Sequence, residues 1–95
     1  MLSEDFANFN RRKEPRRPAK GKVRLVPHGM ALIEGHLVDV AASGFRARHS
    51  CQALTSGQEV SFARRGARGR ARVMWTRIAG DTVESGFLVL PWDER

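Results

Sequence analysis

Apolar and polar residues alternate along most of the chain between Val23 and Val89, so that every second side chain is apolar. A period of two is typical of strands that bury one face and expose the other. Turn-forming residues separate the runs, and no window keeps a helical period. The runs begin near Val23, Met30, Phe45, Val60, Arg70 and Val83. The pattern therefore predicts an all-β protein of six short strands.

Six strands in so short a chain favour a small antiparallel β-barrel, because closure removes the exposed edges of a sheet. Apolar side chains would then fill the barrel, and the arginines that alternate with them would face outward. Gly35, inside the long second run, predicts a bulge or a bend. Trp75 continues an apolar alternation and is expected in the core, and Gly80-Asp81 predicts a hairpin turn.

The residues before the first strand differ from the rest of the chain. Residues 1–10 have no clear period and are expected to form a flexible tail. Residues 11–22 hold seven lysines and arginines against one glutamate, and Pro15 and Pro18 argue against a helix there. We therefore expect a mobile basic arm that becomes ordered when ligand arrives, one domain over residues 11–90, and a C-terminal tail over residues 91–95.

The chain has 95 residues and a formal net charge of +7, which points to an anionic partner. Charge alone leaves nucleic acid, nucleotide, acidic protein and membrane surface open. The single Cys51 excludes an internal disulfide and a multi-cysteine zinc site, and is compatible with a reducing compartment. Nothing resembles a signal peptide, and no run approaches the roughly 20 apolar residues needed to span a bilayer. We expect a cytoplasmic protein without membrane insertion.

The sequence gives little support for catalysis. His28, His36 and His49 lack metal-ligand spacing with each other or with Cys51. No histidine is evidently placed to activate Ser43, and there is no phosphate-binding loop of the Gly-x-x-x-x-Gly-Lys type. We therefore expect no enzyme activity and no cofactor.

Two short motifs carry the candidate chemistry. Arg12 and Arg16 form an Arg-x-x-x-Arg pair in the arm, and guanidinium forks bind both phosphate oxygens and the O6/N7 edge of guanine. Asp39 ends the long second run, and its carboxylate can accept hydrogen bonds from guanine N1–H and N2–H groups. Gly44 follows a turn, where it can take a positive φ and leaves room for a base or a ribose.

The order of these motifs, with the hairpin segments 69–75 and 86–89 behind them, resembles the PilZ family of bacterial second-messenger proteins. The family pattern is Arg-x-x-x-Arg followed by Asp/Asn-x-Ser-x-x-Gly, and the resemblance covers about residues 11–90. It implies a PilZ-like split barrel that binds cyclic di-GMP in the cytoplasm. Ala41 stands where the family has serine, and Ser43 could partly take over the role of that hydroxyl.

The resemblance also implies a role and a ligand number. A chain without an attached output domain would act as an adaptor, whose ligand pulls the arm onto the barrel and changes the surface offered to a protein partner. Arg11, directly before the motif, favours two cyclic di-GMP molecules per chain. Two alternatives remain: a degenerate PilZ interaction module without ligand, which Ala41 supports, and a small basic barrel that binds RNA or DNA by charge.

Overall fold

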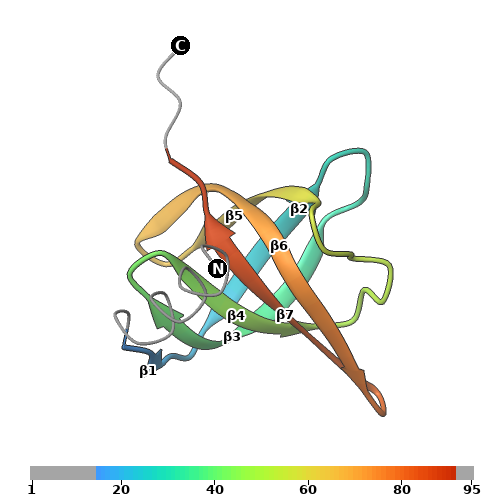
Figure 1. The fold of residues 1–95 in the computed structure, drawn as a ribbon, viewed down its shortest axis with the longest axis horizontal. Coiled ribbons are helices and arrows are strands. Elements are labelled where there is room, and N and C mark those ends of the chain that lie inside the picture. The colour runs from blue at the N-terminus through green and yellow to red at the C-terminus, as the bar shows by residue number, and fades with distance from the viewer. Residues whose placement is uncertain (1–14, 92–95) are drawn as a thin grey trace, which may run out of the picture.

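The computed structural model describes residues 15–91, and these form a closed six-stranded antiparallel barrel with one additional short strand (Figure 1). The strands are β1 (Arg17–Pro18), β2 (Lys22–Pro27), β3 (Ile33–Ala41), β4 (Gly44–His49), β5 (Glu59–Arg64), β6 (Ala67–Ala79) and β7 (Thr82–Val89). No helix occurs within this part of the chain. The predicted all-β barrel is therefore confirmed.

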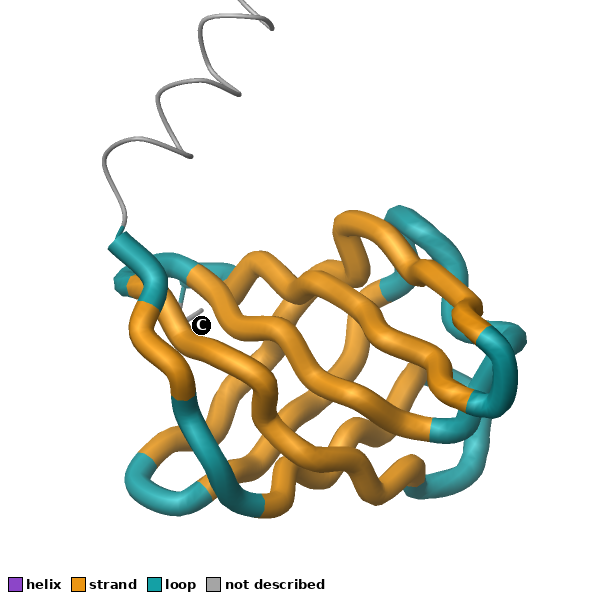
Figure 2. Tube along the Cα trace, turned by 90° about the horizontal axis from the view of Figure 1, so that it is seen from below, coloured by secondary structure: helices purple, strands orange, loops and turns teal. Residues whose placement is uncertain are grey.

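The barrel closes through the strand order β2-β3-β4-β7-β6-β5, in which β5 pairs back with β2. Every pairing is antiparallel, and the strands wrap around a single interior (Figure 2). In this ring β4 lies opposite β5. Side chains on the outer faces of these two strands therefore belong to opposite sides of the molecule.

The alternation in the sequence becomes an alternation between core and solvent. Strand β2 shows this pattern over its full length, because exposed and buried residues alternate strictly along it. Three phenylalanines meet at the centre of the barrel, where the ring of Phe45 lies 5.1 Å from that of Phe62 and 4.8 Å from that of Phe87, centroid to centroid. Burying rings of this size is a main source of stability in a barrel this small.

Two irregularities alter the alternation. The β3–β4 register shifts between Leu37 and Asp39, so Val38 is the extra residue of a bulge. A bulge or a bend was expected at Gly35; the bulge lies instead at Val38, and Gly35 pairs regularly with Val23. A second shift, around Met74 in β6, reverses which side chains of that strand face outward.

The C-terminal part of the predicted arm is already held on the barrel. Strand β1 pairs with β3, placing Arg17 opposite Val40 and Pro18 opposite Asp39. The amide of Ala19 also donates to the carbonyl of Val38 at 3.1 Å. The expectation that the whole arm becomes ordered only with ligand is therefore wrong for this segment. The predicted tail at 1–10, the arm before Pro15 and all of the predicted C-terminal tail (91–95) except Pro91 lie outside the described residues.

A buried histidine joins three strands near one end of the barrel. The Nδ1 of His49 accepts the amide N–H of Cys51 at 3.1 Å, so in the neutral ring Nε2 carries the proton and donates to Ser85 Oγ at 2.8 Å. The hydroxyl of Ser85 in turn lies 2.7 Å from that of Thr76. Burial lowers the pKa of His49 below its ordinary value, because the charged ring loses hydration.

This arrangement predicts acid-sensitive stability. The unfolded chain binds a proton at His49 below about pH 6.5, while the folded chain resists it, so the free energy of unfolding should fall as the pH drops below that value. Urea unfolding between about pH 7.5 and about pH 5 measures this. The decrease in the free energy of unfolding with falling pH should disappear in His49→Gln. It should persist in His36→Gln, which removes an exposed histidine. An unchanged pH dependence of the free energy of unfolding in His49→Gln would show that His49 is not its source.

Candidate functional site

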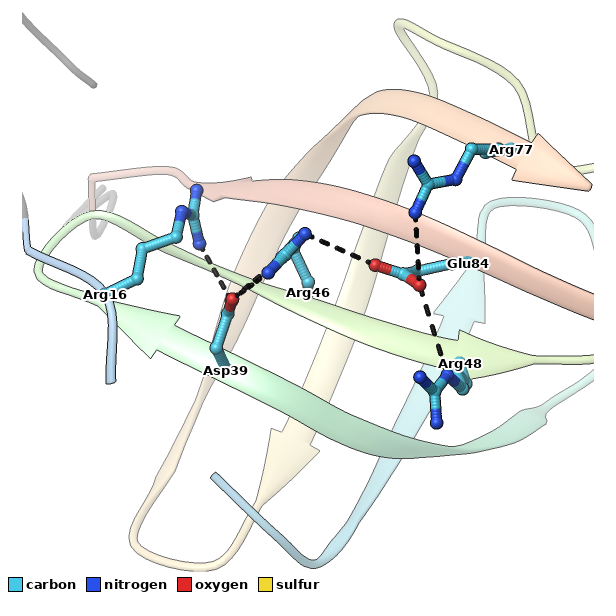
Figure 3. Close-up of polar contacts among 6 residues, drawn as sticks. All are labelled: Arg16, Asp39, Arg46, Arg48, Arg77 and Glu84. Carbon is cyan, nitrogen blue, oxygen red and sulfur yellow. Dashed lines mark hydrogen bonds and ion pairs between the residues drawn. The ribbon is translucent and has the colours of Figure 1, made fainter. Parts of the chain in front are cut away.

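The arm and the β3–β4 hairpin meet at one carboxylate. Arg16, directly before β1, donates from Nη1 to Oδ1 of Asp39 at 3.0 Å (Figure 3). The short ladder between β1 and β3 explains this contact, because it lays the arm beside the end of β3. The two motifs that the sequence separates by 23 positions are therefore adjacent in space.

Asp39 is held from its other side by Arg46 of β4. The turn between Ala41 and Gly44 leaves Asp39 and Arg46 directly opposite each other in the hairpin register. Arg46 donates from Nε at 2.8 Å and from Nη2 to the same oxygen, Oδ2. Such a two-pronged contact fixes both the guanidinium and the carboxylate in orientation.

The protonation of this pair follows from its surroundings. Asp39 is only 5% exposed, and burial by itself would raise the pKa of its carboxyl. Hydrogen bonds and charge from Arg46, and then from Arg16, outweigh burial and hold the pKa of Asp39 below its ordinary value. The hydrogen bond to Asp39 in turn raises the pKa of Arg46. Asp39 is therefore an acceptor at neutral pH.

A second carboxylate extends the cluster across β7 to β6. Glu84 lies 3.5 Å from Nη1 of Arg46, 3.6 Å from Nη2 of Arg77 and 4.0 Å from Nε of Arg48, measured from its carboxylate oxygens (Figure 3). Four arginines, including Arg16, thus surround two carboxylates. The surplus of positive charge makes this outer face, which we call the Asp39 face, suited to an anion.

Trp75 lies next to this cluster, on the outer face of β6. It was expected in the core and is half-buried instead, because the bulge at Met74 turns it outward. Its indole covers Gly86, where a Cβ atom would collide with the ring, and Gly86 pairs with Arg46 on its other side. The guanidinium of Arg77 stands 5.7 Å from the ring centroid. An aromatic surface therefore adjoins the arginine cluster.

Gly44 has a role that differs from the expected one. Its place after a turn would allow a positive φ and was expected to leave room for a ligand, but its backbone does not take that conformation. A Cβ atom at this position would instead collide with the carbonyl oxygen of Phe87 in the neighbouring β7. Gly44 is needed because two backbones approach closely, and it is buried rather than open to a ligand.

The remaining predicted site residues are placed only in part. Ser43 is half-buried in the turn after β3, and its carbonyl accepts the amide of Val89 at 2.8 Å. Ala41 pairs with Gly44 at the end of the same hairpin. Arg11 and Arg12 lie outside the described residues, so their roles stay predictions.

Sequence reasoning missed Arg46, Glu84 and Trp75. A signal for Arg46 was present, because a two-residue turn at 42–43 places residues 39 and 46 opposite each other and their charges are complementary. Glu84 and Trp75 carry no comparable signal, since their positions depend on how β7 pairs with β4 and β6.

Other types of site find little support. Within residues 15–91 no group of histidine, cysteine and acidic side chains is arranged to hold a metal ion. A search of the same residues for a helix long and apolar enough to cross a membrane finds none. Comparison of the sequence with models of known protein families and with curated proteins gives no match.

Proposed function

We propose that this chain is a cyclic di-GMP receptor of the PilZ type and that the Asp39 face holds the ligand. The observation that carries the proposal is the junction of Arg16, Asp39 and Arg46, where the arm and the hairpin motif come together. Guanidinium forks, a deprotonated carboxylate and an adjoining indole are the groups that phosphates and guanine bases require.

Binding would proceed by exchange at Asp39. Arg46 is fully engaged, with Nε and Nη2 on Asp39 and Nη1 near Glu84. Arg16 contributes one contact to Asp39, and its side chain is 47% exposed. Arg16 is therefore the partner that can move to a phosphate, which frees Oδ1 of Asp39 for guanine N–H groups. Arg46 would keep the carboxylate oriented during the exchange.

The signal would come from the arm. Moving Arg16 changes the contact that holds the arm beside β3, and Arg11 and Arg12 would close over the ligand. The resulting surface would be read by a protein partner, and the chain would act as an adaptor without catalysis. Charge-assisted hydrogen bonds would supply most of the affinity, which we place in the micromolar range or tighter.

A second candidate is an interaction module that has lost its ligand. Two observations favour it: both oxygens of Asp39 already have arginine partners, and Ala41 has no hydroxyl to offer. Calorimetric titration with cyclic di-GMP separates the two functions. GTP and a short RNA serve as controls, because preferential binding of the RNA would favour general recognition of polyanions through charge. No heat with any of the three would favour the module.

Replacing Ala41 with serine should strengthen cyclic di-GMP binding modestly. The hydroxyl returns at the position where the family pattern has it, beside Asp39 in the hairpin, and one neutral hydrogen bond contributes about 1 kcal/mol at most. Calorimetry on both proteins measures the change. Equal affinity of Ala41→Ser and the wild type would show that Ser43 or water already serves the ligand.

Arg11 should set the number of bound ligands. With Arg12 and Arg16 it offers more guanidinium forks than one cyclic di-GMP presents to the arm, so we expect two molecules per chain at saturation. Arg11→Leu should reduce the ratio toward one in the same titration. A ratio of one in both proteins would return Arg11 to the role of an ordinary surface charge.

A further inference from the structure

A separate hollow of about 540 Å³ opens at the end of the barrel where β1 leads into β2. Leu37 and Val40 form an apolar wall, and both pack against the barrel core. The remaining lining comes from the β1–β2 linker, the first residue of β2, the last residue of β5 and the turn that follows it. The charged side chains of the pocket are Lys20, Lys22, Arg64 and Arg65. We call this hollow the mouth pocket.

Among residues 15–91, the cations of the mouth pocket have no anionic partners. No acidic residue of this range lines the pocket, and none of the four cations forms an ion pair with a carboxylate of this range. This contrasts with the Asp39 face, where every arginine has a carboxylate nearby.

Arg64 gives a more specific indication. It pairs with Val23, whose side chain is fully buried. Because paired residues of neighbouring strands face the same side of a sheet, the side chain of Arg64 points from β5 toward the interior at this end of the barrel. Its Nε atom is buried and has no hydrogen-bond partner in the described part of the chain. A buried N–H without an acceptor is unfavourable, and an oxygen of a bound anion or of water would satisfy it.

The mouth pocket is distinct from the Asp39 face. Adjacent residues of a strand point to opposite faces, so Val40 faces the pocket while Asp39 faces the outer surface. The two sites share no lining side chain. The proposal for the mouth pocket therefore does not rest on the proposed cyclic di-GMP function.

We propose that the mouth pocket binds a small molecule that carries a phosphate monoester group on an apolar body. A phosphate dianion matches several cations better than a single carboxylate does, and its oxygens are strong acceptors for guanidinium N–H groups. The wall of Leu37 and Val40 would receive the apolar part. The volume lies within the range of about 300–1,000 Å³ that is usual for small-molecule sites.

Phenyl phosphate is the probe that tests this proposal, since it joins a dianion to an apolar ring. Calorimetry should show that it binds roughly fivefold or more tightly than inorganic phosphate, because ring burial adds to the anion contacts. Phenol, which lacks the phosphate, should not bind measurably. No binding of phenyl phosphate at millimolar concentration, or equal affinity for phenyl phosphate and inorganic phosphate, would overturn the proposal.

Variants locate the site. Arg64→Met keeps an apolar stem and removes the guanidinium, and Lys22→Gln removes a second cation; each should weaken phenyl phosphate binding by about tenfold. Arg68→Gln is the matched control, because Arg68 is an exposed β6 arginine that lies outside the pocket and has no carboxylate partner within the described residues. Should Arg64→Met fail to fold, Lys22→Gln carries the test.

Two results would contradict the location. An equal loss in Arg68→Gln would indicate general attraction of anions to a basic protein. Loss of phenyl phosphate binding in Asp39→Ala, with unchanged binding in Lys22→Gln, would place the phosphate on the Asp39 face instead. We expect phenyl phosphate binding to be retained in Asp39→Ala and weakened in Lys22→Gln. This expectation is the same whether or not the protein binds cyclic di-GMP.

Discussion

Replacing Arg16 with alanine should weaken cyclic di-GMP binding by about 2–3 kcal/mol, or roughly 30- to 150-fold. The reason is that Arg16 is the most exposed member of the Asp39 junction and holds Asp39 by a single contact, so it is the arginine that we expect to move to a phosphate. Asp39→Ala should weaken binding by a similar amount, because the acceptor for guanine N–H groups is lost and Arg46 loses its orienting partner. Isothermal titration calorimetry measures both changes.

The control for this prediction is Arg24→Ala. Arg24 lies on the outer face of β2, is 67% exposed and stands 3.9 Å from Glu34, so its removal changes the net charge without touching the Asp39 face. Its effect on affinity should be less than about threefold, as for a screened surface charge. If Arg16→Ala weakens binding while Asp39→Ala does not, the site attracts anions without reading guanine, and the nucleic-acid alternative gains.

Gly44→Ala should destabilise the fold strongly, by about 3 kcal/mol or more. The new Cβ atom would meet the carbonyl oxygen of Phe87, which belongs to backbone and cannot rotate away. Strands β4 and β7 would have to separate where Gly44 pairs with Leu88. Urea unfolding measures the loss, and a large loss without ligand would assign Gly44 to packing rather than to ligand access.

Gly69→Ala provides the comparison for Gly44→Ala. Gly69 also lies in a strand without a positive φ, and a Cβ atom there would stand 3.4 Å from the ring of Phe62, an ordinary contact. Its stability should change by less than about 1 kcal/mol. Equal destabilisation of the two variants would contradict the close-approach explanation.

The fold could largely be predicted because its strands follow a local rule. The alternation from Val23 onward gives the faces of β2, and Gly80-Asp81 marks the turn that joins β6 to β7. The bulges at Val38 and Met74 could not be predicted in the same way. A bulge depends on the register between neighbouring strands, and valine and methionine at these two positions give no sequence signal for one.

Only those parts of the candidate site that lie within one continuous segment of the chain could be predicted from the sequence. Asp39 follows from its place before a turn, and Arg46 could have followed from the hairpin register. The family resemblance implied only that Arg16 and Asp39 meet the same ligand; their direct contact was not expected, since it depends on the pairing of β1 with β3. Trp75 was misplaced because a bulge one residue earlier reverses its direction.

Nuclear magnetic resonance of the isotope-labelled protein, titrated with cyclic di-GMP, tests the central claim most directly because it locates the ligand. The amide signals of the β3–β4 hairpin, including Asp39 and Arg46, should shift together with the indole N–H signal of Trp75, while those of β5 on the opposite side stay in place. No shifts at millimolar ligand, or shifts in β5 with none in the β3–β4 hairpin, would contradict the account.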